Sequence, residues 1–427
     1  MIPLLASAST HSYPGWSVVP FVLLLLSIAI LPLVASHWWH SNRNKALVAA
    51  LMGVPVALYV AFVSPASLAH TGLEYLAFCS LIGSLYVIAG GVELQGRLPG
   101  NSWAVAGVLA AGAVLANLVG TTGASMLLIR PLLRAVDGRK DRSHIVVFFI
   151  FIVSNCGGLL TPLGDPPLFL GFLQGVPFTW TLNLWKEWAI ANGILISVFL
   201  VVDTARVRRE AAPPPPVADA GRLRLRGVSN LALLACVVGA IIGGGALAPR
   251  WGASTAQLAQ AFALIFLAAA SLAITPREIR KANDFSWHPF LEVVFLFAGI
   301  FAAMIPALGV LQEKGPSLPV REPWQFFWAT GMLSGFLDNA PTYLAFVSIA
   351  SFLPDEIIGT TYAALTAISC GAVFFGALTY IGNGPNFMVK AIAEHSGVRM
   401  PSFFGYLAWS VTILLPIYVL LTFLFFR

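Results

Sequence analysis

Long apolar runs, separated by short polar or basic segments, dominate this chain. Runs such as Val18–Val34, 231–247 and 403–426 reach or approach the roughly 20 residues that a helix needs to cross a hydrocarbon core. The pattern predicts spans at 17–36, 46–64, 72–94, 145–160, 187–203, 229–248, 256–274, 289–312, 359–378 and 403–426. The sequence therefore predicts an all-α, polytopic membrane protein with about ten transmembrane helices.

Two further apolar stretches, 103–134 and 323–353, are too long for one ordinary span. The first is interrupted by Gly120-Thr121-Thr122-Gly123 and the second by Asp338-Asn339-Ala340-Pro341. Each stretch is either one long kinked helix or a re-entrant hairpin of two half-helices. The choice between these alternatives depends on where the basic residues fall.

The basic residues favour the hairpins. If 103–134 crossed the membrane once, the basic segments 130–144 and 204–227 would lie outside, against the positive-inside rule. With two hairpins, the cytoplasmic connections hold nearly all of the 24 lysines and arginines. The exceptions are Lys186, Arg250, Lys314, Arg321 and Arg427. We therefore predict that the first hairpin opens to the cytoplasm, the second opens to the outside, and both chain ends are periplasmic.

Composition supports a bacterial inner-membrane protein and excludes several other classes. Charged residues make up 10% of the chain, whereas a soluble protein carries about 25%. The net charge of +6 is explained by topology, so we predict membrane lipid and no nucleic acid as a partner. The start of the chain has no basic region before its first apolar run, which predicts a retained helix. The cysteines lack paired spacing, which argues against a disulfide framework or a zinc site: Cys79, Cys156, Cys236 and Cys370.

An internal repeat becomes visible when the chain is shifted against itself by 218 residues. The shift places 158–169 on 376–387 with six of twelve positions identical, and it places Gly120 on Asp338. An odd number of predicted crossings separates the copies, so they are expected to be inverted. We predict a first repeat at 1–203, a basic, proline-rich cytoplasmic linker at 204–227 and a second repeat at 228–427. Inverted repeats with broken helices at matching positions are typical of secondary transporters.

Polar motifs at membrane depth mark two broken helices, predicted at 145–175 and 359–396, and the two hairpin tips. Glycine and proline open a helix there and free backbone carbonyls, which are tolerated only in protein or beside a polar cavity. Carbonyl, hydroxyl and amide oxygens together suit an alkali cation. The predicted ion- and proton-binding residues are Asp165, Asp338, Asn339, Thr342, Thr121, Thr122, Ser154, Asn155, Thr161, Thr379 and Asn383.

Asp165 and Asp338 are the two sharpest signals. A carboxylate at the bilayer centre costs about 2.5–3.5 kcal/mol on the insertion scale. Burial also favours the protonated form of a carboxyl group, which lets it trade a proton for a cation near physiological pH. We predict that both aspartates bind Na⁺ transiently. The structural alternative is that each caps the N-terminus of a half-helix.

At these motifs the chain resembles the ion transporter superfamily, which includes NhaD-type sodium/proton antiporters, a citrate transporter branch, arsenite permeases and divalent-anion/sodium symporters. It is most similar to the antiporter-like branch, through Asp338-Asn339-Ala340-Pro341 and Pro162-Leu163-Gly164-Asp165. The resemblance covers nearly the whole chain and implies two inverted halves with sodium and proton binding at these residues. It departs from the symporters, whose hairpin tips carry Ser-Asn-Thr. A homodimer is an expectation from the resemblance alone.

The leading hypothesis is therefore a secondary transporter that exchanges Na⁺ or Li⁺ for H⁺ by alternating access, with no cofactor beyond the transported ions. The alternative is cation-coupled transport of citrate or a dicarboxylate, or of an oxyanion such as arsenite. A small carboxylate would need cationic groups, yet only Arg130 and Lys390 lie at the predicted cytoplasmic ends of the site. An enzyme is not expected, because the chain has no metalloprotease motif and no convincing nucleophile–base pair.

Overall fold

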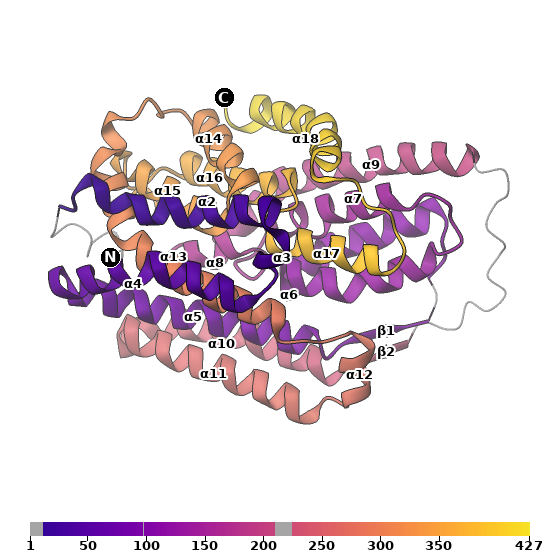
Figure 1. Ribbon diagram of the computed structural model, residues 1–427, viewed down its shortest axis with the longest axis horizontal. Helices are drawn as coiled ribbons and strands as arrows, with labels where there is room; N and C mark the ends of the chain where they lie inside the picture. The colour runs from indigo at the N-terminus through magenta and orange to yellow at the C-terminus, as the bar shows by residue number, and fades with distance from the viewer. Residues whose placement is uncertain (1–11, 97, 210–223) are drawn as a thin grey trace.

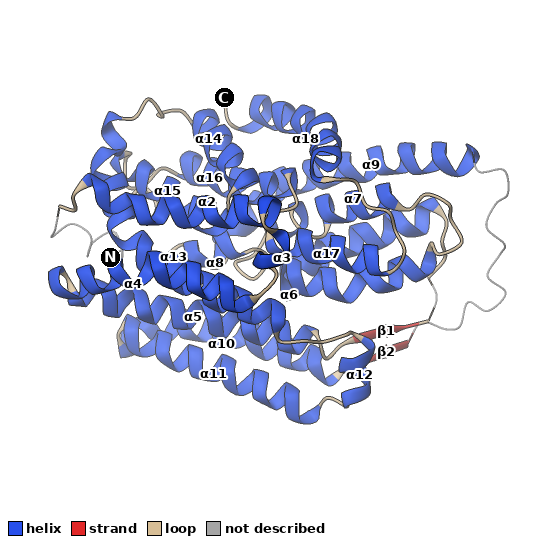
Figure 2. Cartoon of the chain, viewed as in Figure 1, coloured by secondary structure: helices blue, strands red, loops and turns tan. Residues whose placement is uncertain are grey.

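The computed structural model of the protein describes residues 12–96, 98–209 and 224–427. Nearly all elements in these ranges are helices (Figure 2). Nine of the described helices are long and apolar enough to cross a membrane. The chain is therefore an all-α, multi-pass membrane protein, as the apolar pattern predicts.

The first half of the chain contains one interrupted long helix and one broken helix among its spans. Its helices are α2 (Val19–Val34), α3 (Ser36–Trp39), α4 (Asn42–Val63), α5 (Pro65–Ala89), α6 (Ser102–Ala135), α7 (Ser143–Ile152), α8 (Pro166–Leu173) and α9 (Trp185–Arg209). Its 3₁₀ turns are η2 (Gly15–Val18), η3 (Cys156–Leu159) and η4 (Trp180–Leu184).

The second half follows a matching order. Its helices are α10 (Ser229–Trp251), α11 (Ala253–Ile274), α12 (Arg277–Ala282), α13 (His288–Lys314), α14 (Pro323–Phe336), α15 (Asn339–Ile349), α16 (Tyr362–Phe375), α17 (Gly384–His395) and α18 (Phe403–Phe425). Its 3₁₀ turns are η5 (Gly315–Ser317), η6 (Ala350–Phe352) and η7 (Gly376–Leu378). Helix starts recur at the 218-residue shift, since Pro166 corresponds to Gly384 and Trp185 to Phe403.

The first long apolar stretch folds back on itself at Gly120. This residue has φ 78° and ψ 156°, a left-handed backbone conformation that favours glycine and interrupts α6. Gly112 and Leu128 are sixteen residues apart, and a straight helix would separate them by about 24 Å. A Cβ placed on Gly112 would instead lie 3.0 Å from Leu128 Cδ1. The two arms of α6 therefore run antiparallel. In the second stretch, α14 and α15 pack together and are separated by two residues with extended backbone, Leu337 and Asp338.

The two broken helices run in opposite directions. Helix α7 packs against α17, and α16 packs against α8, so the first part of each lies beside the second part of the other. At one end, a Cβ on Gly397 would lie 3.9 Å from Arg142, just before α7. At the other end, a Cβ on Gly175 would lie 3.7 Å from Ile358, shortly before α16. Both breaks consequently fall midway through the molecule.

The helices form two packing groups. One contains α2, α4, α5, α10, α11 and α13, and we call it the α5–α13 group. The other contains α6–α9 and α14–α18, and we call it the hairpin group. Figure 1 shows α5, α10 and α11 side by side in the first group, with α14, α16 and α18 on the opposite side of the molecule. The groups meet where α5 contacts α6 and α8 and where α13 contacts α15.

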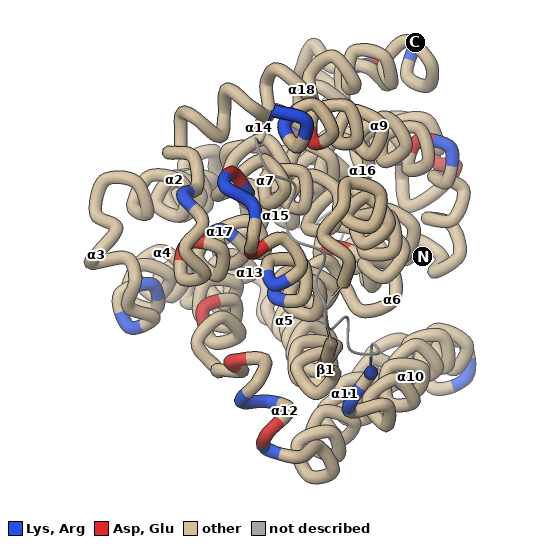
Figure 3. Tube along the Cα trace, turned by 90° about the vertical axis from the view of Figure 1, so that its right-hand side faces the viewer, with Lys and Arg blue, Asp and Glu red and all other residues tan. Residues whose placement is uncertain are grey.

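The segment between the halves differs from the predicted linker of 204–227. Helix α9 continues to Arg209, and β2 (Arg224–Arg226) pairs antiparallel with β1 (Glu93–Gln95), so both ends of the predicted linker are structured. The polar strand β2 has no buried face, which is why the apolar pattern gave no sign of it. Residues 210–223 of this prediction lie outside the described ranges. Figure 3 views the molecule from the end that carries β1 and β2. Lysines and arginines lie there on α12 and near α7 and α17.

Candidate ion-binding site

Asp165 lies at the end of the first break and immediately precedes α8. Two prolines, Pro166 and Pro167, begin this helix; they lack an N–H that the first turn would leave unpaired, and their fixed φ suits a helix start. The Asp165 side chain is buried, with 1% of the residue exposed. Local sequence thus ends the unwound segment at a carboxyl group in the protein interior.

Three donors meet the Asp165 carboxylate, each from a different interrupted segment. Thr121 Oγ1, at the first hairpin tip, donates to Oδ1 at 2.9 Å. Asn383 Nδ2, at the second break, donates to the same oxygen at 3.0 Å. Asn339 Nδ2, at the second hairpin tip, donates to Oδ2 at 2.5 Å. Both hairpins and both breaks therefore converge on one carboxyl group.

Four helix N-termini converge at the same place. The second arm of α6 starts after Gly120, α8 follows Asp165, α15 starts at Asn339, and α17 follows Asn383. Each helix N-terminus carries a partial positive charge of about half an elementary charge, so all four favour negative charge between them. This field and the three hydrogen bonds offset the cost of burying a carboxylate.

A threonine anchors each break to the hairpin of its own half. Thr161 Oγ1 donates to the Asn117 carbonyl at 2.5 Å, and Thr379 Oγ1 donates to the Gly335 carbonyl at 2.6 Å. Thr161 and Thr379 are related by the 218-residue shift, as are their two acceptors. The halves therefore use the same hydrogen bond to place a break against a hairpin.

The two breaks also touch each other through asparagine side chains. Asn155 Nδ2 donates to Asn386 Oδ1 at 2.7 Å, and Asn383 Nδ2 donates to Asn155 Oδ1 and to the Ser154 carbonyl, both at 3.2 Å. All of these side chains are buried. The Ser154 hydroxyl lies 2.7 Å from that of Ser125. The site is thus a continuous polar cluster within an apolar core.

The remaining predicted residues lie at the hairpin tips but do not bond to Asp165. Asp338 is half-buried and accepts from the Ala340 amide at 3.0 Å, which caps α15. Thr342 Oγ1 donates to the Asp338 carbonyl at 2.8 Å. Thr122 is half-buried and makes no side-chain hydrogen bond to a described residue. Asp338 consequently adjoins the cluster through its neighbour Asn339 rather than by direct contact with Asp165.

Three residues of the cluster were not predicted from sequence: Asn117, Ser125 and Asn386. Asn117 holds the first break, because its Nδ2 donates to the Gly157 carbonyl at 2.7 Å and its Oδ1 accepts from the Leu160 amide at 2.7 Å. Asn386 follows the Gly-Asn-Gly-Pro motif by one residue, which is the one sequence signal that pointed near it.

The donor set suits a hard monovalent cation better than a transition metal. In the described part of the chain, no three His, Cys, Asp or Glu side chains gather as a metal site. The oxygens near Asp165 belong to amides, hydroxyls and backbone carbonyls, which are the ligands that hard cations prefer. The hydrogen-bond donors that reach the carboxylate are neutral, so no described Lys or Arg neutralises it.

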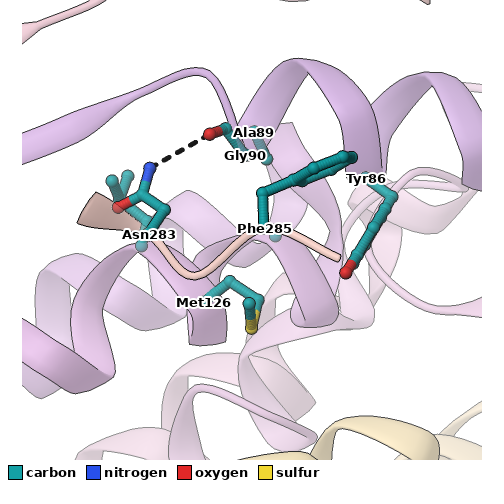
Figure 4. Close-up of a pocket in the computed structure, with 8 residues that line it drawn as sticks. Tyr86, Ala89, Gly90, Met126, Asn283 and Phe285 are labelled. Carbon is teal, nitrogen blue, oxygen red and sulfur yellow. Dashed lines mark hydrogen bonds between the residues drawn. The ribbon is translucent and has the colours of Figure 1, made fainter. Parts of the chain in front are cut away.

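A small pocket is lined by none of the side chains that bond in this cluster (Figure 4). It is formed by the end of α5, the second arm of α6 and the segment before α13. Its lining residues are Tyr86, Ala89, Gly90, Gly123, Met126, Leu127, Asn283 and Phe285. Asn283 Nδ2 donates to the Gly90 carbonyl at 3.1 Å across one edge. The lining contains no carboxylate, and we assign no ion binding to it.

The chain matches a known protein family over nearly its whole length. A family model described as "Putative citrate transport" matches residues 10–426. The chain is also similar to an uncharacterized transporter of Synechocystis sp., with 26% identity over 317 residues, which covers 67% of this chain and 68% of that protein.

Proposed function

The chain belongs to the family described as "Putative citrate transport", and from this premise we propose that it is a membrane transporter that exchanges Na⁺ or Li⁺ for H⁺. The exchange proceeds by secondary active transport and needs no catalytic step. Na⁺ and H⁺ are its cargo rather than resident cofactors.

The observation that carries this proposal is the surroundings of Asp165. A buried carboxyl group that meets only neutral donors can hold a proton or a cation, but not both at once. Binding of Na⁺ therefore requires loss of the proton, and protonation releases Na⁺. Competition between Na⁺ and H⁺ for this one carboxyl group is the simplest way to couple their opposite fluxes. Asp338, half-buried at the adjoining hairpin tip, contributes a second negative charge to the same region.

Alternating access follows from the two packing groups. The cluster lies within the hairpin group, which meets the α5–α13 group through α5 and α13. Movement of the hairpin group against these two helices exposes the cluster to one side of the membrane at a time. Polar contacts link the two groups, such as Gln174 Nε2 to Glu74 Oε1 at 2.9 Å and Arg130 Nη2 to Asp284 Oδ2 at 3.0 Å. These contacts must break and reform during the cycle.

Cation-coupled transport of citrate, a dicarboxylate or an oxyanion such as arsenite is the second candidate. It is favoured by the description of the family and by the four helix N-termini, whose positive ends suit an anion. It is disfavoured by Asp165, which already occupies the point where these helices converge and would repel a carboxylate. In the described part of the chain, no Lys or Arg bonds to Asp165 or to its three donors, so the cluster lacks a cationic side chain that could bind such a substrate.

Everted vesicles that contain the protein distinguish the two candidates. The vesicles are energised to an acidic interior and then given sodium, lithium or citrate. Sodium or lithium is expected to collapse the pH gradient, and potassium citrate is expected to have no effect. Sodium-dependent uptake of citrate without cation-driven proton release would overturn the proposal and establish the second candidate.

The environment of the protein is part of the same proposal. The cation-rich end seen in Figure 3 faces the cytoplasm of a bacterial inner membrane, in accord with the positive-inside rule. The chain ends then lie on the periplasmic side. Membrane lipid covers the exposed apolar helices, and pairing with a second copy is an expectation that follows from the resemblance.

A further inference from the structure

Asn386, which lies next to the candidate site without touching Asp165, has a fixed side-chain orientation. Its Nδ2 donates to the Gly376 carbonyl at 2.7 Å and to the Thr379 carbonyl at 2.9 Å. The reversed amide would place its oxygen against two carbonyl oxygens in a buried region, where an unpaired polar group costs about 1–3 kcal/mol. The Asn386 oxygen must therefore point away from these carbonyls, toward Asn155.

This orientation is passed along a chain of amides to Asp165. Asn386 Oδ1 accepts from Asn155 Nδ2 at 2.7 Å, and that nitrogen also donates to the Ile150 carbonyl at 2.8 Å. Asn155 Oδ1 therefore faces Asn383 and accepts from its Nδ2 at 3.2 Å. The same Asn383 nitrogen donates to the Ser154 carbonyl at 3.2 Å and to Asp165 Oδ1 at 3.0 Å. Backbone carbonyls thus hold every amide of this chain in one direction.

The other two donors to Asp165 are free to turn. Asn339 Nδ2 donates to Asp165 Oδ2 and to no backbone carbonyl of the described residues. The Thr121 hydroxyl can rotate and offer a lone pair in place of its hydrogen. These two side chains can present oxygen to a cation, whereas Asn383 presents N–H. One of the three donors to the carboxylate is therefore fixed, and the other two are adjustable.

We propose that Asn386 is a positioning residue of the ion site: acting through Asn155, it holds Asn383 as a permanent donor to Asp165 Oδ1. The cation binds beside Oδ2, where Asn339 turns its oxygen inward, and the Thr121 hydroxyl, which bonds Oδ1, turns a lone pair toward it. This inference rests on the proposed cation/proton exchange and adds which side of the carboxylate the cation uses. Preorganisation of Asn383 spares the site the cost of ordering that amide at each binding event.

The internal repeat supplies well-matched substitutions for a test. At the 218-residue shift, Asn386 corresponds to Leu168 and Asn155 corresponds to Val373, both of which are buried. Asn386→Leu and Asn155→Val therefore introduce residues that the other half accommodates at the equivalent places. Asn192 provides a control, because it is buried and its Nδ2 donates to the Cys156 and Trp188 carbonyls without joining the amide chain. Its equivalent is Ser410, so the control variant is Asn192→Ser.

The experiment measures sodium-driven proton release by the purified protein in proteoliposomes as a function of Na⁺ concentration. Asn386→Leu and Asn155→Val are each expected to raise the KM for Na⁺ about tenfold, the effect of one lost hydrogen bond to a charged group. The maximal rate of these two variants should stay within about twofold of the wild type. Asn192→Ser should keep both its KM for Na⁺ and its maximal rate within about twofold of the wild type. The double variant should match either single variant, because both substitutions release the same amide of Asn383.

Two outcomes would overturn the inference while leaving the proposed function intact. One is an unchanged KM in Asn386→Leu or, if that variant does not fold, in Asn155→Val. The other is a double variant whose KM rises by the product of the two single effects, which would mean that the residues act separately. If the wild type itself releases no protons on addition of Na⁺ or Li⁺, the proposed function fails and this inference fails with it.

Discussion

A carboxylate without a cationic partner is costly at the centre of a membrane protein, and Asp165 is such a group. The penalty for burying an ion is of the order of several kcal/mol even after the protein relaxes. Here two hydrogen bonds to Oδ1 and one to Oδ2 share the charge among neutral donors. A cation that replaces part of this donor set is attracted by the carboxylate, because no described Lys or Arg bonds to it in competition.

Thr121, one of the two adjustable donors to Asp165, offers a test of the site. Thr121→Val keeps the shape of the side chain but removes the hydroxyl that bonds Asp165 at 2.9 Å. The apparent affinity for Na⁺ is expected to fall about tenfold or more, since hydrogen bonds to charged groups contribute about 1.5–3 kcal/mol. Thr121→Ser keeps the hydroxyl and should retain nearly all of the affinity. Equal Na⁺ dependence of proton release in the valine, serine and wild-type proteins would show that the hydroxyl has no part in ion binding.

Sequence could place the central residues of the cluster but not its supports. Asp165, Thr121, Asn339 and Asn383 are polar residues in apolar runs interrupted by glycine or proline, and the structure brings these four together; their role in binding ions stays a prediction. The supports lie beside the same motifs but carried a weaker signal, because the equivalent positions in the other half carry no matching amide or aliphatic hydroxyl. Asn117, Ser125 and Asn386 correspond to Gly335, Tyr343 and Leu168.

At the level of elements, each break is folded tightly enough that two glycines touch. A Cβ on Gly164 would lie 2.1 Å from the Gly158 carbonyl oxygen, and a Cβ on Gly382 would lie 2.7 Å from the Gly376 carbonyl oxygen. The two pairs are related by the 218-residue shift. Close backbone approach, together with the threonine anchors, therefore defines the same unwound loop in both halves.

Gly164→Ala is expected to destabilise the protein strongly, because the added methyl group overlaps a backbone carbonyl that cannot turn away. Overpacking of this kind costs about 1–3 kcal/mol or more. Gly384→Ala is the matched control, since a Cβ at Gly384 meets no atom within 4 Å. The measurement is the melting temperature and the yield of monodisperse protein in detergent. A Gly164→Ala protein as stable as the Gly384→Ala protein would contradict this account of the break.

Elements marked by polar residues within an apolar run could be predicted from the sequence. Elements that depend on pairing between distant segments could not. Gly120 and the Leu337-Asp338 pair interrupt apolar runs, so the hairpin tips were visible in the sequence. The ribbon of β1 and β2 was not, because it joins Glu93 to Arg226 across more than a hundred residues with no alternating apolar pattern. Its formation depends on where α5 and α10 end in space.

On the scale of the whole molecule, sequence could not assign helices to lipid or to protein. Helices α5 and α10 both read as membrane spans, yet 67% of the residues in the apolar window of α5 are buried and only 17% in that of α10. Lipid tails are as apolar as a protein core, so hydrophobicity alone does not distinguish the two environments. The arrangement of two packing groups around α5 and α13 therefore emerges only from the folded structure.

The proposed orientation is tested by labelling single cysteines in a background without Cys236, the exposed native cysteine. Arg208→Cys lies at the exposed end of α9, and Ser317→Cys lies in the exposed turn after α13. A membrane-impermeant thiol reagent should label Arg208→Cys in everted vesicles and Ser317→Cys in right-side-out vesicles. Labelling of both from the same side, or with the sides exchanged, would contradict the orientation.

The central claim is that one buried carboxyl group holds either H⁺ or Na⁺, and a binding measurement tests it without transport. Purified protein in detergent is placed in weakly buffered solution at constant pH, and proton release is recorded as NaCl is added, with choline chloride as the control salt. The wild type is expected to release protons saturably with Na⁺, and Asp165→Asn is expected to release none. Na⁺ binding to the wild type without proton release, or equal release from Asp165→Asn, would contradict the account.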